Sequence, residues 1–557
     1  MNLGAAKILA SCCLLIVASP IVLFTQQKKA APESAALSDQ HYQKGVKALE
    51  RGDLVDATKE FRLAVRFAPK SAPAHNSLGF ALLQSGQVDA AITEFRKAIA
   101  LGPSFTAAYL NMAKALEQRN DLDGAIQFYQ QLLHQKPDSA DAHLGLGKVL
   151  GHRGNLLGAR SEFEAALKLA PEWAEAHYQL GLADWFLQDY VSAASQFRSA
   201  LDLKPDSPDA HYYLGLVYDK QGQVEKALEE LQAAAKLNSR SAEIANALGL
   251  VLHREGYLGD ASTEFRRATE LDPKKPEMHN NLGLVLLGQG DGDGALREFQ
   301  TAVALEPQYL PARNNLGLVY LQKAMWEDAI ATYHELIRDD PSDAVAHYNL
   351  GVALKQKESY DDATLALRQA IELQPDLPEA HYTLGVILWQ QGKLDDAATQ
   401  FRAAIRAKPD YEEAHYILGS VFRQKGDVDA ALEELQAALR LDPKDAGAHQ
   451  ALGTALRQKG NLAGAAQEFH QAEILNKEKM NTQAAGLATN TGAKQLRQGD
   501  IEGSIDQFHS ALKLAPGYAP AHYQLALALR QKGDMEQARM EFEKAQQIDP
   551  HLKPPRD

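Results

Sequence analysis

The chain has 557 residues and a formal net charge of −14. A surface this acidic repels phosphate backbones, which makes nucleic acid a poor candidate partner. Its only two cysteines, Cys12 and Cys13, are adjacent, which excludes a disulfide framework.

Residues 1–25 have the arrangement of a signal or membrane-anchor segment. A short N-terminal stretch ends in Lys7, and residues 8–24 contain no charged side chain. A bilayer crossing takes about 20 apolar residues, so a retained anchor and a cleaved export signal both remain open, and we favour the anchor. Leu9–Cys12 also resembles a bacterial lipoprotein cleavage box. We expect a membrane-anchored or exported protein of a bacterial periplasm or cell envelope, with membrane contact through residues 8–24 only.

After a polar, alanine-rich linker at residues 26–37, a 34-residue period governs the chain. Thirteen copies follow without insertion over residues 38–479, and two more occupy residues 485–552. In the copy at residues 378–411, apolar residues three or four apart indicate two helices, and Gly392 and Pro409 interrupt the chain after each. Each repeat therefore predicts two antiparallel helices joined by a tight turn.

The repeat is defined by a few fixed positions. Position 8 is Gly in thirteen copies, position 20 is Ala in fourteen, and position 4 is His in eleven. In the copy at 378–411 the landmarks are His381, Leu384, Gly385, Leu388, Gly392, Ala397, Phe401, Ala404 and Pro409. Because Gly inside a helix costs about 1 kcal/mol against Ala, we expect the position-8 glycines to mark close contacts between helices.

These positions resemble the pattern of the tetratricopeptide repeat family, although that family often has Trp where this chain has His at position 4. The resemblance covers about nine tenths of the chain. It implies an all-α fold, a right-handed α-solenoid superhelix of about fifteen helix-turn-helix repeats. Such a superhelix has a concave inner groove lined by the first helix of each repeat.

The period is interrupted once, at residues 480–484. These five extra residues precede a repeat that has lost most landmarks, and position 28 of the repeat before them is the charged Glu473. We expect an insertion or kink there, with repeats fourteen and fifteen offset. Residues 553–557 form a tail.

The eleven histidines at position 4 are the residues that most invite a metal site. Each is about one repeat from the next, and none has the i, i+4 partner that places two ligands on one helical face. We interpret them as half-buried rings packing between helices. No phosphate-binding loop or catalytic constellation stands apart from the repeat, so we expect no catalytic residue, no cofactor, no metal and no enzyme activity.

Positions 2, 5, 6, 9 and 13 share one face of each first helix. The candidate peptide-binding residues on this face are Asn246, Asn280, Asn281, Asn314, Asn315, Asn349, Tyr178, Tyr212, Tyr348, Tyr382 and Tyr416. Amides can bind the backbone of an extended peptide, and tyrosines add apolar contact with a polar tip. The alternative, that Asn is merely tolerated on a wet helix face, remains open. Position 2 is mostly acidic, which argues against binding a terminal carboxylate.

The sequence therefore predicts a non-catalytic interaction scaffold that binds proteins or extended peptides in its groove. An alternative follows from the asparagine row, which resembles the row lining the repeat superhelix of O-linked N-acetylglucosamine transferases. That resemblance suggests a substrate-presenting subunit for a separately encoded glycosyltransferase, since no catalytic half is present in this sequence.

Overall fold

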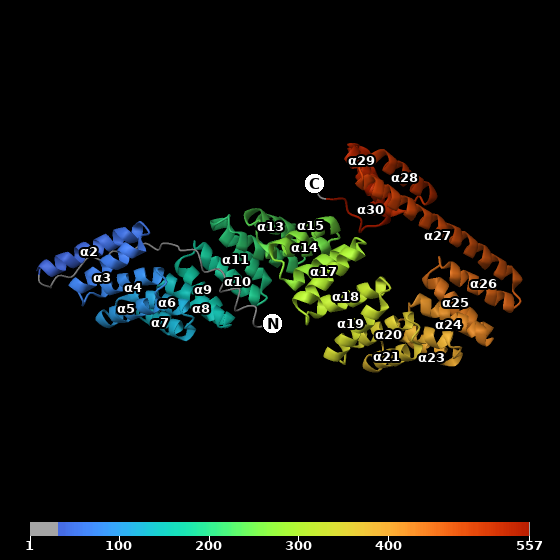
Figure 1. Cartoon of the computed structure of the whole chain (residues 1–557), viewed down its shortest axis with the longest axis horizontal. Helices are drawn as coiled ribbons and strands as arrows, with labels where there is room; N and C mark the ends of the chain where they lie inside the picture. Colours follow the sequence, from blue (N-terminus) through green and yellow to red (C-terminus); the bar gives the residue numbers. More distant parts are fainter. Residues whose placement is uncertain (1–31, 556–557) are drawn as a thin grey trace. The chain divides into compact units, whose positions relative to one another are not determined.

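The computed structural model describes residues 32–555, and the chain divides into two compact units, Met1–Arg240 and Ser241–Asp557. The described residues form helices α2 to α30 and no strand (Figure 1). The predicted all-α solenoid of helical hairpins is confirmed. The predicted membrane segment at residues 8–24 lies outside the described residues. No helix between residues 32 and 555 is both long and apolar enough to cross a membrane.

Each repeat contributes a first helix, called the A helix here, and a second, the B helix. The helices of the first unit are α2 (Pro32–Glu50), α3 (Leu54–Phe67), α4 (Ala72–Gln84), α5 (Val88–Leu101), α6 (Thr106–Gln118), α7 (Leu122–Gln135), α8 (Ala140–His152), α9 (Leu156–Leu169), α10 (Ala174–Phe186), α11 (Tyr190–Leu203), α12 (Pro208–Lys220) and α13 (Val224–Leu237). In this unit the even-numbered helices are A helices. Each packs on the B helix that follows it and, from α4 onward, on the B helix before it.

The second unit continues the same alternation up to α26. Its helices are α14 (Ala242–Arg254), α15 (Leu258–Leu271), α16 (Pro276–Gly288), α17 (Gly292–Leu305), α18 (Leu310–Gln322), α19 (Trp326–Asp339), α20 (Ala344–Gln356), α21 (Tyr360–Leu373), α22 (Pro378–Gln390), α23 (Leu394–Ala407), α24 (Glu412–Lys425), α25 (Val428–Leu441), α26 (Ala446–Gln458), α27 (Leu462–Arg497), α28 (Ile501–Leu514), α29 (Ala519–Lys532) and α30 (Met535–Ile548).

Local residues set where each helix starts and stops. The Ser71 hydroxyl caps α4 by accepting a hydrogen bond from the Ala74 amide at 3.3 Å, and the Asp121 carboxylate caps α7 in the same way. Between A and B helices the chain turns through a left-handed residue, usually glycine, as at Gly290 with a φ of 81°. The left-handed turn residues and, in helices such as α4 and α7, the side-chain caps therefore help to set the helix ends.

Within a hairpin, the position-8 glycine of the A helix faces a bulky side chain from position 24 of the B helix. A Cβ on Gly283 would lie 2.6 Å from the Phe299 ring, and one on Gly385 would lie 2.9 Å from the Phe401 ring. Both phenylalanines are fully buried. The expectation that these glycines mark close helix contacts is confirmed.

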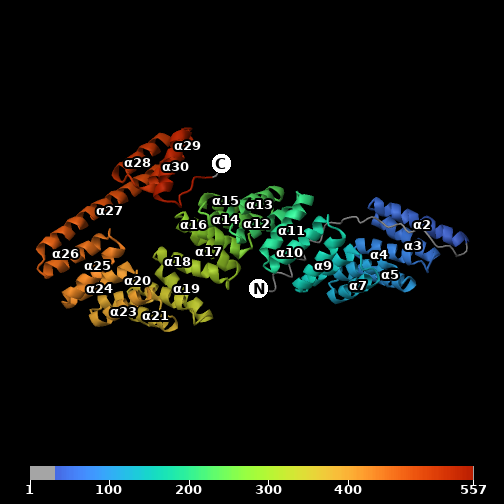
Figure 2. The same ribbon diagram turned by 180° about the vertical axis from the view of Figure 1, so that it is seen from behind.

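The insertion at residues 480–484 does not form a loop. These residues lie inside α27, in which the B helix of repeat thirteen and the A helix of repeat fourteen are joined into one helix of 36 residues (Figures 1 and 2). Position 32, proline in most repeats, is Lys477 here, so nothing breaks the helix. The long helix α27 packs on α28 and α29.

The segment after α30 returns to the start of the second unit. The Lys553 ammonium lies 3.8 Å from the Glu255 carboxylate and 5.1 Å from the centre of the Tyr257 ring, at the turn between α14 and α15. Figures 1 and 2 both show the coloured segment after α30 running towards these helices. The tail at residues 553–557 is therefore anchored, in its described part, by an ion pair and a cation–π contact.

The glycine contact makes a testable prediction. Gly283→Ala should lower the stability of the chain by about 1–3 kcal/mol, because its Cβ must displace a fully buried ring. Gly259→Ala is the matched control, since Gly259 lies in α15 with no atom within 4 Å of the added Cβ. We expect this control to be neutral or stabilising by up to about 1 kcal/mol. Thermal unfolding followed by circular dichroism measures both, and equal midpoints would contradict the contact.

Candidate functional site

The candidate asparagines predicted on the A-helix face lie in the second unit and are partly used within the protein. The Asn281 amide donates a hydrogen bond to the Asn246 side-chain oxygen at 2.9 Å, and the Asn315 amide donates to the Asn280 oxygen at 2.8 Å. Each bond joins position 6 of one repeat to position 5 of the repeat before it. Asn280 is only 4% exposed. These four residues therefore form a ladder that ties successive A helices together.

The next step of this ladder is open. Asn314 on α18 and Asn349 on α20 occupy the same two positions, but no hydrogen bond joins them within the described structure. Asn314 is exposed and Asn349 is half-buried. Their amides are thus the asparagine groups of the predicted set that remain most available to a ligand.

The predicted tyrosines of the first unit belong to an aromatic cluster. Tyr178 is only 7% exposed and packs against Phe197 and Tyr213, with ring centroids 5.9 and 6.3 Å away. Tyr212 is half-buried and lies 5.1 Å from Tyr213. Tyr213, at position 6, was not singled out from the sequence. Burial makes Tyr178 a core residue, whereas Tyr212 still reaches solvent.

The predicted tyrosines of the second unit stand on successive A helices and all remain half-buried. They are Tyr348 on α20, Tyr382 on α22 and Tyr416 on α24. Tyr382 packs edge-on against Phe401 at 5.8 Å and lies 5.1 Å from Tyr411, which precedes α24. The sequence reasoning missed Tyr411 because it sits at position 34, in the link before the helix rather than on its face.

Carboxylates surround these rings and change their acidity. Burial raises the pKa of Tyr382, with Glu413 and Glu412 adding to the shift. Burial also raises the pKa of Glu412 to about 7, with Asp445 and Glu413 as further causes. Burial is the larger cause in both cases, and the smaller contributions of the neighbouring carboxylates place negative charge beside these groups on α22 and α24.

The eleven position-4 histidines pack between helices, as interpreted from the sequence. In the second unit, the His279 ring bonds the Glu298 carboxylate through Nδ1 at 2.7 Å and the Pro273 carbonyl through Nε2 at 3.0 Å. Both partners are acceptors, so the ring donates both bonds only when it is protonated. The Glu298 bond is accordingly the main cause that raises the pKa of His279. The residues from 32 to 555 contain no cluster of three potential metal ligands.

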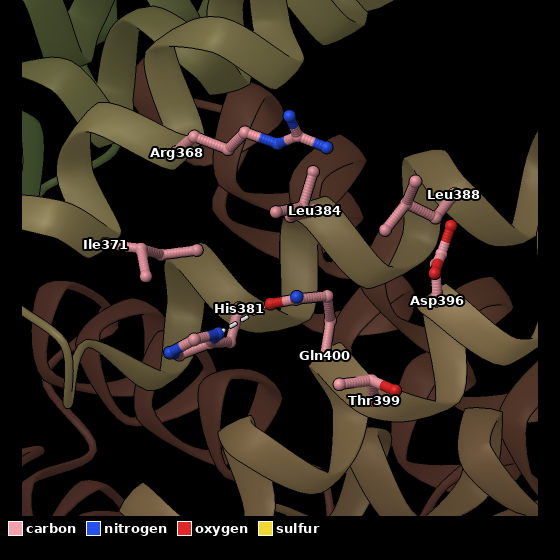
Figure 3. Close-up of a pocket in the computed structure, with 8 residues that line it drawn as sticks. All are labelled: Arg368, Ile371, His381, Leu384, Leu388, Asp396, Thr399 and Gln400. Atoms are coloured by element: carbon pink, nitrogen blue, oxygen red, sulfur yellow. Dashed lines mark hydrogen bonds between the residues drawn. The ribbon is translucent and has the colours of Figure 1, made fainter.

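A cavity of about 250 Å³ lies between α21, α22 and α23 (Figure 3). His381 and Gln400 face one another across it and share a hydrogen bond of 2.7 Å. Arg368 and Ile371 border it from α21. None of the candidate groove residues lines this cavity, and its polar wall is one of the repeated histidine contacts. It is therefore a crevice of the repeat stack and not the predicted binding surface.

Comparison with known proteins identifies the same repeat over most of the chain from residue 82 onward. The model of the cilia and flagella-associated protein 70 C-terminal domain matches residues 275–487. Models of the tetratricopeptide repeat match residues 82–148, 116–184, 178–242, 252–290 and 494–552. No curated protein sequence matches the chain.

Several solved structures are similar to parts of the chain. YrrB, described as a tetratricopeptide repeat protein with an unusual peptide-binding site, is 27% identical over 33% of this chain and 95% of its own, with a TM-score of 0.30. Yeast Tom70 is 17% identical over 76% of this chain and 96% of its own, with a TM-score of 0.33. The Cut9–Hcn1 structure is 16% identical over 93% of this chain and 94% of its own, with a TM-score of 0.31.

The histidine contact predicts a pH dependence. A raised folded-state pKa of His279 stabilises the protein below the unfolded value of about 6.5, and this contribution is lost as pH rises through the folded-state value. Glu298→Gln should therefore flatten the fall of the unfolding midpoint between pH 6 and pH 8.5, by about 1–2 °C. Glu306→Gln, at an exposed position that follows the same helix, should leave the slope unchanged. Parallel slopes for wild type and Glu298→Gln would contradict the assignment.

Proposed function

Because the chain belongs to the tetratricopeptide repeat family, whose arrays serve protein–protein interaction, we propose that it is a non-catalytic scaffold that binds proteins or extended peptides along its A-helix face. The repeat uses its glycines, histidines and B-helix aromatic residues for internal packing. The A-helix face keeps polar and aromatic groups that this packing does not consume. A binding role on this face is the function that the geometry supports best.

The open step of the asparagine ladder carries the proposal. At the two steps before it, an amide and a carbonyl oxygen are paired across repeats. At Asn314 and Asn349 the same groups have no hydrogen-bond partner in the described structure. An extended peptide presents alternating amide and carbonyl groups, which match side chains that both donate and accept. These two residues can therefore hold a peptide backbone whatever its side chains.

We also propose that residues 8–24 hold the protein at a membrane or direct its export, on the strength of their uncharged apolar run. Fractionation of cells that express the full chain tests this proposal. A retained anchor places the protein in the membrane fraction with Met1 or its neighbour as the first residue, and a cleaved export signal leaves a shorter mature chain. Recovery of the full-length chain in the soluble cytosolic fraction would contradict both.

A capture experiment tests the binding role. The full chain carrying Asn314→Ala and Asn349→Ala should bind its partner from an extract of the native organism about thirtyfold more weakly than wild type, since each lost hydrogen bond weakens binding by about 1 kcal/mol. The control carries Thr301→Ala and Gln308→Ala, two exposed changes on or after the B helix α17. Undiminished capture by the asparagine variant would show that these two residues of the A-helix face do not bind the partner.

A further inference from the structure

We propose that the A-helix face between α20 and α24 selects extended peptide segments that carry lysine or arginine side chains. This inference rests on the proposed peptide-binding function and names the chemistry of the ligand. The tyrosine–carboxylate surface, as we call it, comprises Tyr348, Tyr382, Tyr411, Tyr416, Glu379 and Glu413.

The rings of this surface are held in place. Tyr382 is fixed between the buried Phe401 and Tyr411. Thr383 forms a side-chain hydrogen bond with Tyr348. Rigid, half-exposed tyrosines offer a large contact area at little cost in side-chain entropy. The surface is therefore preorganised for a ligand.

One of these rings already holds a cation from its own chain. The Lys408 ammonium lies over the Tyr411 ring, 4.8 Å from the centroid. Tyrosine faces attract ammonium and guanidinium groups, and arginine also stacks on them. The contact shows which chemistry this ring face accepts.

The carboxylates of this surface lack the cation that an equivalent carboxylate has elsewhere. In the first unit, Glu175 at position 2 pairs with Lys148 at position 9 of the repeat before it, at 2.7 Å. Glu379 and Glu413 also stand at position 2. The position-9 residues before them are Val352 and Val386, which cannot pair with a carboxylate.

Neither Glu379 nor Glu413 forms an ion pair within the described residues, and Glu413 is exposed. A lysine or arginine of a bound peptide can take the place that Lys148 occupies beside Glu175. Burial is the main cause that raises the pKa of Tyr382, and the nearby carboxylates of Glu413 and Glu412, which add to it, favour the same ligand charge. The cations Lys408 and Arg423 also face this surface, but the carboxylates of Glu379, Glu413 and Asp445 outnumber them. Glu412 adds less charge because its pKa is about 7.

Binding of labelled peptides to the full-length protein tests the inference. The probe is a fluorescein-labelled ten-residue peptide of alternating Arg and Ser, compared with Glu–Ser and Gly–Ser peptides by fluorescence anisotropy. We expect the Arg–Ser peptide to bind at least about tenfold more tightly than the Gly–Ser peptide, and the Glu–Ser peptide to bind most weakly.

One double variant and its matched control locate the binding of the Arg–Ser peptide on the surface. Glu379→Gln with Glu413→Gln should weaken Arg–Ser binding by about tenfold, because two desolvated charge contacts are lost. Asp361→Asn with Glu433→Gln changes the net charge equally on the exposed B-helix side and should alter binding by less than about twofold. Both pairs replace side chains without an ion-pair partner, and circular dichroism confirms that each variant folds.

Two further single variants test whether a lysine of the protein itself can replace the cation of the peptide. Val386→Lys places an ammonium where it can pair with Glu413, as Lys148 pairs with Glu175, and should weaken Arg–Ser binding. Leu284→Lys adds the same charge at position 9 of another repeat. Position 2 of the repeat after it is Pro311 and not a carboxylate, so this variant should weaken Arg–Ser binding less.

The outcomes separate the two proposals. Equal binding of the Arg–Ser and Gly–Ser peptides would overturn the selectivity for basic segments and leave peptide binding standing. Equal losses of Arg–Ser binding in the test and control variants would contradict the placement of the binding site on the tyrosine–carboxylate surface. If none of the three peptides binds, this inference falls, while the capture experiment with Asn314 and Asn349 decides the proposed function independently.

Discussion

The contact between a glycine and a bulky B-helix side chain sets the geometry of thirteen of the fifteen hairpins. The ring of Phe299 occupies the space that a side chain on Gly283 would need, so the two helix axes approach closely. The histidine then ties the hairpin to the link before it: His279 bridges Glu298 on the B helix and the carbonyl of Pro273. Together these contacts fix the spacing between the two helices of the hairpin and the position of the link that joins it to the preceding repeat. The interior positions have little freedom to vary, and variation is left to the A-helix face.

This division of roles explains which parts of the structure can be predicted from the sequence. Positions 8, 20 and 32 recur because packing and chain breaks allow few residue types, so the helical hairpins and the close glycine contacts follow from the period alone. The continuous helix α27 is harder to foresee. The five extra residues at 480–484 indicate a departure from the repeat, and Lys477 in place of proline permits a helix. Only the structure decides between a loop and a helix, because both satisfy the same local pattern.

The candidate site is predicted less completely, for a different physical reason. The sequence places Asn280 and Asn315 on one face, but whether their amides serve a ligand or each other depends on the spacing between repeats. In the structure Asn315 bonds Asn280. Similarly, Tyr178 and Tyr382 occupy the same position in their repeats, yet Tyr178 is buried by Tyr213, whereas Tyr382 stays half-exposed beside Tyr411. Contacts between neighbouring repeats, which the period does not encode, decide which side chains remain available.

The charge of the A-helix face shows the same dependence on neighbours. Net charge alone describes the whole chain as acidic, and an acidic residue at position 2 is common along it. The ion pair between Lys148 and Glu175 neutralises one such residue internally. Where position 9 is valine and not lysine, as at Val386, the carboxylate of Glu413 is left for an external cation. A single substitution at a position that packing does not constrain can thus change the ligand chemistry of one repeat while the fold stays the same, which is how a uniform stack can acquire a local specificity.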